Sequence, residues 1–282
     1  MLTTQDRIIE GAAKALADAD SLIISASNGL SISEGINLFA DDASFQKNLG
    51  DFRAKYGLRN MLQGMGAHWP QETTYWAYWN RLYQRYVKSY TPGAIMASLK
   101  QIVGDKPYFI ITSNGETHFE RAGFERDSIW EIEGMWTAMQ CASACNNEIY
   151  SAESVFETME PYTEQMDVPE ELIPHCQYCG NRMRIHSAFE PQFVHNQGAY
   201  VRWQSFLEAH SMGHPVVLEL GIGWRNQLIK APLMEWVRQT PNAQYVTINL
   251  AELYIPKDIA SQSFGLEGTI ESMLWKLSES RR

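Results

Sequence analysis

The chain has 282 residues, of which 45% are hydrophobic and 20% charged; this excludes general disorder and allows one large domain, alone or with a small module. Its 23 Lys and Arg against 33 Asp and Glu give a net charge of −10, which argues against nucleic acid as a partner. No apolar run is long enough to span a bilayer and no export signal begins the chain, so we expect a cytoplasmic protein without a membrane partner.

The N-terminal segment predicts a helix, a strand and a ligand-binding loop. Apolar residues recur with helical spacing over 5–20, and residues 22–24 follow as a short buried strand. Residues 25–33 are small and polar and predict a loop before Gly35. This order is typical of nucleotide-binding α/β domains, because the backbone of such a loop can approach a pyrophosphate closely.

Residues 68–90 are rich in Trp and Tyr. Five of these aromatic residues step by three and four and so share one face of a helix: Trp76, Trp79, Tyr83, Tyr86 and Tyr90. The favoured interpretation is the core stripe of an inserted helical module at about 40–92. The alternative is the wall of a pocket.

Four further apolar runs have the length of buried strands, at 108–111, 129–132, 216–220 and 245–248. With helix-like stretches between them, they predict an α/β fold: a Rossmann-like, mainly parallel sheet with helices on both faces. Such folds bind ligands beyond the C-terminal ends of their strands. Gly221 and Gly223 follow one of these runs and could cradle the adenosine side of a dinucleotide.

All four cysteines lie within residues 136–190. Cys141 and Cys145 form C-x3-C, and Cys176 and Cys179 form C-x2-C after a long loop. This spacing predicts a tetrathiolate zinc site in a small module, with reduced core thiols as the alternative. Four sulfur ligands leave no position for water, so the zinc would be structural.

Six short segments in chain order carry the motifs of one known family. They are 27–31 with 34–39, 112–116 with 122–123, 131–134 followed by Cys141, the two cysteine pairs, 221–223, and 248–249. The chain therefore resembles the sirtuins, the Sir2-like NAD-dependent enzymes. Apart from the cysteine pairs, the sirtuin motifs are GAGxS…SGIPDFR, TQNxDxLHxxAG, ELHG followed by Cys, GTS and IN.

The resemblance implies an NAD site in a domain of residues 1–135 and 190–282, with the zinc module at 136–190. Asn114 would hold the nicotinamide ribose, and Glu116, which replaces a family Asp, would contact the carboxamide or the ribose. The expected cofactor-binding residues are Ser27, Asn28, Gly29, Ser31, Gly35, Ser113, Asn114, Gly221, Gly223 and Asn249.

The sequence departs from the sirtuin pattern at residues that would take part in the reaction. Glu133 stands where sirtuins have the histidine base, and Leu38 and Ala40 stand where they have Asp and Arg. A glutamate, with a pKa of about 4.3 against about 6.5 for histidine, is the weaker base unless burial raises its pKa. As a carboxylate, Glu133 could instead stabilise an oxocarbenium-like cation and position an acceptor.

The resemblance, together with these departures, leaves three functions open. The first is cleavage of the nicotinamide–ribose bond with transfer of ADP-ribose to a protein acceptor; the resemblance also implies it, because a macrodomain-associated branch of sirtuins lacks the base histidine and acts this way. The second is an NAD-dependent lysine deacetylase or deacylase, with His195 as an alternative source of a base. The third is a module that binds NAD or ADP-ribose without turnover. The acceptor and the oligomeric state are not indicated.

Overall fold

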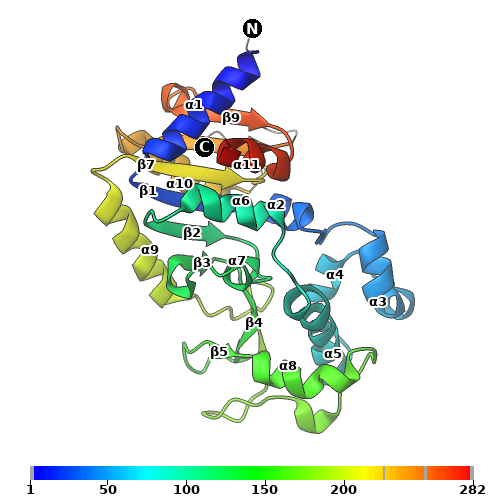
Figure 1. Ribbon diagram of the computed structural model, residues 1–282. Coiled ribbons are helices and arrows are strands. Elements are labelled where there is room, and N and C mark those ends of the chain that lie inside the picture. The colour runs from blue at the N-terminus through cyan, green and yellow to red at the C-terminus, as the bar shows by residue number, and fades with distance from the viewer. Residues whose placement is uncertain (1–2, 225, 251–252, 280–282) are drawn as a thin grey trace.

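Figure 1 shows the computed structural model of the protein, which describes residues 3–224, 226–250 and 253–279. The larger lobe contains a six-stranded sheet in the order β3-β2-β1-β7-β8-β9, and every neighbouring pair is parallel. This is the strand order of the Rossmann fold, so the predicted parallel sheet is confirmed. Its strands are β1 (Ser21–Ala26), β2 (Tyr108–Thr112), β3 (Ile129–Glu131), β7 (Pro215–Leu220), β8 (Gln244–Asn249) and β9 (Ser263–Glu267).

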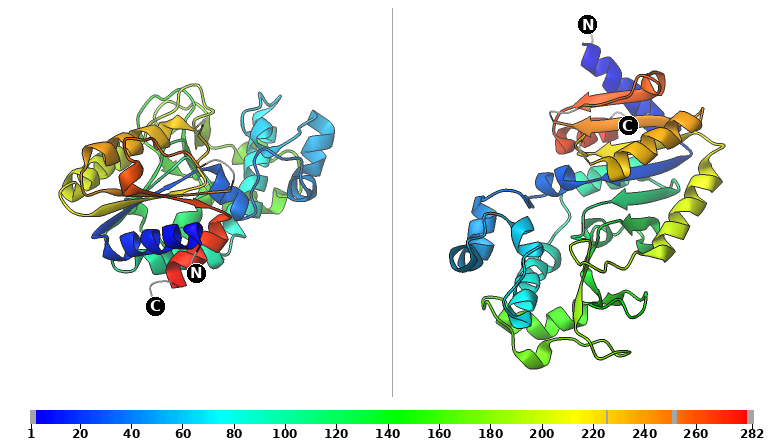
Figure 2. Two further views of the ribbon diagram at one scale, coloured as in Figure 1. Left: turned by 90° about the horizontal axis from the view of Figure 1, so that it is seen from above. Right: turned by 180° about the vertical axis from the view of Figure 1, so that it is seen from behind.

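Helices cover both faces of this sheet, as the view from above in Figure 2 makes plain. Alternate residues of β1 point to opposite faces. Leu22 and Ile24 therefore pack against α1 (Thr4–Asp18), α6 (Ala94–Val103) and α11 (Ile270–Glu279). Ile23 packs in the other layer, with α9 (Gln197–His210) and α10 (Gln227–Gln239). Burial on both faces explains why the central strands are continuous apolar runs.

A smaller lobe lies beside the β3 edge of the large sheet, below it in Figure 1. It joins a helical insertion to a three-stranded antiparallel sheet of order β5-β4-β6. The insertion contains α3 (Ala43–Tyr56), α4 (Met61–Met65), α5 (Glu72–Leu82) and the π-helix η1 (Tyr83–Lys88). The second part contains β4 (Gly134–Cys141), β5 (Tyr150–Ser151), α8 (Glu153–Met159) and β6 (Met183–Ser187).

The two parts of the small lobe share one hydrophobic core. Phe156 of α8 stacks on Tyr83, with ring centroids 4.5 Å apart, and contacts Trp76 at 6.0 Å. The aromatic stripe is thus mainly core, as favoured, since Trp76, Trp79, Tyr83 and Tyr86 are buried. The domain boundaries expected from the sequence remain a prediction.

One local expectation was wrong, and one strand of the large sheet was not predicted. Residues 25–33 are not a loop throughout, because β1 continues to Ala26 and a short helix α2 (Asn28–Ser33) follows. Burial of Leu30 and Ser31 stabilises this turn, a tertiary effect that propensity does not reveal. The edge strand β9 was missed, because Ser263–Glu267 is short and contains a glycine.

The shortest helical segments are α7 (His118–Arg121), η2 (Arg126–Ser128), η3 (Glu160–Tyr162), η4 (Glu170–Leu172) and η5 (Ala260–Gln262).

Candidate active site

The order of the strands in the sheet reverses between β1 and β7. From β1 the chain goes on to β2, whereas β7 on the other side leads to β8. A parallel sheet opens into a crevice at such a switch point, beyond the carboxyl ends of the strands. Ser27, Ser113 and Gly221 directly follow the ends of β1, β2 and β7, so three of the predicted residues meet here.

Gly29, at the start of helix α2, touches Gly221 of the loop after β7 backbone to backbone in this crevice. The Gly29 N–H donates to the Gly221 carbonyl at 3.2 Å, and a Cβ atom on Gly29 would lie 2.5 Å from that oxygen. Gly221 has φ +62, in the left-handed region that favours glycine. Asn249 of β8 holds the same loop by donating to the Ile222 carbonyl at 3.2 Å. This close backbone contact, the Gly29–Gly221 cradle, leaves no room for a Cβ atom on either glycine.

Four polar side chains form a connected cluster beside the cradle. Ser113 Oγ donates to Ser27 Oγ at 3.0 Å, and Asn226 Nδ2 also donates to Ser27 Oγ at 3.0 Å. Asn114 Nδ2 donates to the Ser27 carbonyl at 3.1 Å. Asn114 Oδ1 is buried and accepts no hydrogen bond from any described residue. A buried acceptor without a partner fits a ligand hydroxyl.

Next to this cluster lies a cavity of about 260 Å³. It brings together four of the residues that the sequence analysis singled out: Asn28, Ser113, Asn114 and Glu133. Its remaining lining is largely apolar and comes mostly from the small lobe and the loop after β6: Leu38, Leu62, Met65, Gly115, Trp136, Ser187, Ala188 and Phe189. Leu38 thus lines the cavity at the position where sirtuins have Asp. The sequence did not indicate this apolar wall, which depends on the lobes packing together.

Glu133 is the acidic residue of this cavity. The residue is exposed overall, yet partial burial of its carboxyl group raises its pKa. No described residue forms a side-chain hydrogen bond or ion pair with it. The carboxylate is therefore available to a ligand or to an incoming acceptor.

Glu116 does not line the cavity. Its carboxylate accepts a hydrogen bond from Ser31 Oγ at 2.7 Å, and the side chain is buried. Gly35 stands past the end of α2 with φ +91, and Gly223 accepts from the backbone N–H of Asn226 at 3.0 Å. Ser31, Gly35 and Gly223 therefore shape the loops and do not line the cavity.

A second buried pair, His118 and Glu34, joins the two segments that the Ser31–Glu116 hydrogen bond also joins. His118 Nδ1 lies 3.0 Å from Glu34 Oε2, and Nε2 lies 2.9 Å from the Tyr86 carbonyl. Tyr90 stacks on the imidazole and donates to Glu34 at 2.8 Å. Burial alone would lower the pKa of His118, but the Glu34 hydrogen bond, the Glu116 charge and the Tyr86 carbonyl outweigh it and raise the pKa.

His195 does not reach the cavity. It lines a different cleft, with Arg126 and Met135 on the opposite side of β4. Nothing in the described residues brings its imidazole to Glu133 or Asn114. The histidine considered as an alternative base is not part of this site.

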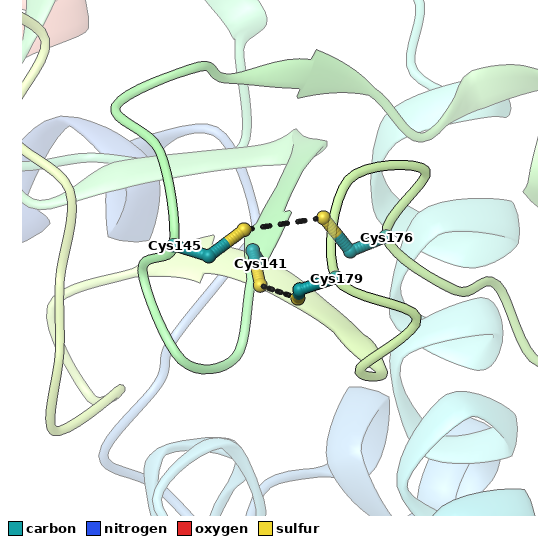
Figure 3. A group of neighbouring side chains, drawn as sticks. All are labelled: Cys141, Cys145, Cys176 and Cys179. Atoms are coloured by element: carbon teal, nitrogen blue, oxygen red, sulfur yellow. Dashed lines mark hydrogen bonds between the residues drawn. The ribbon is translucent and has the colours of Figure 1, made fainter.

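The four cysteines converge at one end of the small sheet, as Figure 3 shows. Cys141 and Cys179 sulfurs are 3.6 Å apart, those of Cys145 and Cys176 are 3.5 Å apart, and all four lie within 4.8 Å of one another. Tetrahedral zinc with Zn–S bonds of about 2.3 Å requires sulfurs about 3.8 Å apart. The cluster thus fits the predicted structural zinc.

Comparison with known proteins agrees with this geometry. No family model matches the chain. A protein ADP-ribosyltransferase of Staphylococcus aureus (strain Mu50 / ATCC 700699) is 28% identical over 267 residues, covering 92% of this chain and 84% of the relative. A probable bifunctional ADP-ribose hydrolase/ADP-ribosyltransferase of Fusarium oxysporum f. sp. cubense is 26% identical over 223 residues, which are 74% of this chain but only 36% of that protein.

Solved Sir2 structures share the fold over almost the whole chain. A Sir2 homolog–NAD complex superimposes with a TM-score of 0.63 over 96% of this chain and 93% of its own, at 17% identity. Sir2Tm bound to a propionylated peptide gives 0.59 over 97% and 98%, also at 17% identity. Among the described residues, no helix is long and apolar enough to cross a bilayer.

Proposed function

We propose that this sirtuin-like chain cleaves the nicotinamide–ribose bond of NAD and transfers ADP-ribose to a protein acceptor. The observation that carries the proposal is the pairing, in one cavity, of a free carboxylate, Glu133, with the unpartnered buried acceptor Asn114 Oδ1. The names of the two relatives support the same reaction. A cytoplasmic setting belongs to the proposal, because thiolates that bind zinc need a reducing compartment.

NAD fits the residues that are present. The Gly29–Gly221 cradle brings two backbone segments together at the strand ends with no side chain between them, and Asn114 Oδ1 can accept from a ribose hydroxyl. Ser27, Ser113 and Asn249 hold the loops that form this surface. The cavity beyond them is the place for the nicotinamide end.

In the reaction, the bond from the ribose C1′ atom to the nicotinamide nitrogen breaks and its electron pair leaves with nicotinamide. The Glu133 carboxylate stabilises the positive charge that develops at C1′. The acceptor nucleophile forms the new bond at C1′, and its proton passes to Glu133, whose raised pKa favours that transfer. Deacylation needs a base near neutral pKa in later steps; among the described residues no histidine lines this cavity, so Glu133 would have to serve as that base as well.

The test is Glu133→Gln, which keeps the shape of the side chain but removes its charge. We expect nicotinamide release, and transfer of labelled ADP-ribose to lysate proteins, to fall by roughly 10²-fold or more. Glu157→Gln, an exposed change on α8, is the matched control. Unchanged nicotinamide release in Glu133→Gln would refute the assigned role, and NAD binding without release in the wild type would favour the binding-module alternative.

A further inference from the structure

We propose that Asn226, a residue outside the sirtuin-like motifs, is a positioning residue for the dinucleotide. Its side-chain amide fixes Ser27 and Ser113 at the ends of β1 and β2, and through them it fixes Asn114. This inference rests on the proposed function, because NAD is the ligand that these loops would hold.

Asn226 forms contacts with residues that follow three different strands, β1, β2 and β7. Nδ2 donates to Ser27 Oγ at 3.0 Å and lies 3.4 Å from Ser113 Oγ, and the backbone N–H donates to the Gly223 carbonyl at 3.0 Å. Asn114 follows Ser113 directly and is bonded to the Ser27 carbonyl. Any shift of the two serines therefore moves Asn114, whose Oδ1 is the buried acceptor beside the cavity.

Asn226 does not do what an asparagine at this position ordinarily does. It is the N-cap residue of α10, where an Asn side chain usually accepts a hydrogen bond from an N–H of the first turn, worth about 1 kcal/mol. Its side chain makes no such bond. In the matching place on α9, Asn196 does cap its helix, accepting from the Ala199 N–H at 3.0 Å.

The helix does not need Asn226 to stay docked. One turn further along α10, Lys230 forms a fully buried ion pair with Glu219 of β7 at 2.6 Å. Ile229 and Leu233 are buried in the same layer. The amide of Asn226 is thus directed at the ends of β1 and β2 instead of at helix stability.

The experiment uses two substitutions that are good helix caps but lack the amide donor of Asn226. Asn226→Ser is too short to reach Ser27, and Asn226→Asp can only accept from the two serine hydroxyls and adds a negative charge beside the Gly29–Gly221 cradle. We expect the free energy of unfolding to stay the same or rise, while kcat/KM for nicotinamide release falls roughly tenfold or more. Calorimetry should also give a higher Kd for NAD. Asn196→Asp, a cap exchange on α9, is the control and should leave both unchanged.

The outcomes separate the inference from the proposed function. Wild-type kinetics and wild-type NAD affinity in Asn226→Ser overturn the inference. So does a parallel loss of stability and activity, because that indicates a structural role. If the wild type binds NAD but releases no nicotinamide, the proposed reaction fails, while a weaker Kd in the variants still supports Asn226. A wild type that binds no NAD overturns both.

Discussion

Gly29 and Gly221 meet where two strand ends leave no room for side chains. We predict that Gly29→Ala separates α2 from the loop after β7, because its Cβ atom would lie 2.5 Å from the Gly221 carbonyl oxygen and 2.6 Å from the Gly221 Cα atom. Backbone shifts of this kind cost about 1–3 kcal/mol. NAD binding should weaken at least in proportion, as calorimetry would measure.

Gly50 provides the matched control for that substitution. It also lies in a helix, α3, but nothing stands within 4 Å of its Cβ position. Gly50→Ala should stabilise the protein by about 0.5–1 kcal/mol and leave NAD affinity unchanged. Equal NAD affinity in both variants would show that the glycine contact is not part of the binding surface.

The buried His118–Glu34 pair makes stability depend on pH. The pKa of His118 is raised in the folded protein above its unfolded value of about 6.5. Its contribution to stability is therefore fully present below pH 6.5 and is lost as the pH rises through the folded pKa. The groups that face the ring are Glu34, Glu116 and Tyr90, of which the two carboxylates favour the charged form.

The measurement compares urea unfolding of the wild type with His118→Gln from pH 6 to pH 9. We expect the variant to be less stable at pH 6 and the difference to shrink as the pH rises. A stability difference that is constant over this range would mean that the imidazole does not gain its proton in the folded state.

At the scale of elements, α10 is held on the sheet by a charged pair instead of by apolar contacts alone. Lys230 and Glu219 are essentially inaccessible to solvent, and Glu219 also accepts from Thr247 at 2.8 Å and from Tyr245. Lys230→Met leaves this carboxylate buried without its cation. We predict a loss of about 3–5 kcal/mol in the free energy of unfolding.

A double-variant cycle checks the origin of that loss. Adding Glu219→Gln to Lys230→Met removes the uncompensated charge and keeps an oxygen for Thr247, so most of the stability should return. If the double variant is as unstable as the sum of the two single ones, the loss comes from packing and not from charge.

The elements that the sequence predicted best are those specified locally. The apolar runs of β1, β2, β7 and β8 are continuous because both faces are buried, and the cysteine spacing reflects the geometry of one ion. The sequence did not predict that Glu116 lies outside the cavity wall, nor that Asn226 contacts Ser27 and Ser113. Both depend on which strand ends meet in space, and one sequence does not give side-chain direction at a loop.

At the scale of the whole molecule, the zinc ligands are part of the core that the helical insertion uses. Cys141 and Cys176 are buried in the same cluster as Trp76 and Phe156. The small lobe also supplies Leu62 and other apolar residues of the cavity wall. Loss of the metal should therefore act on the catalytic cavity as well as on the cysteine loops.

We predict that zinc removal by a chelator speeds amide hydrogen exchange over both 43–88 and 134–187, while β1, β2, β7 and β8 keep their protection. Cys179→Ser should have the same effect without a chelator. NAD turnover should fall because Leu62 and Met65 would no longer close the cavity, whereas the Gly29–Gly221 cradle should still bind the dinucleotide. Faster exchange confined to the cysteine loops would contradict the shared core, since the helical insertion would then be stable without the metal.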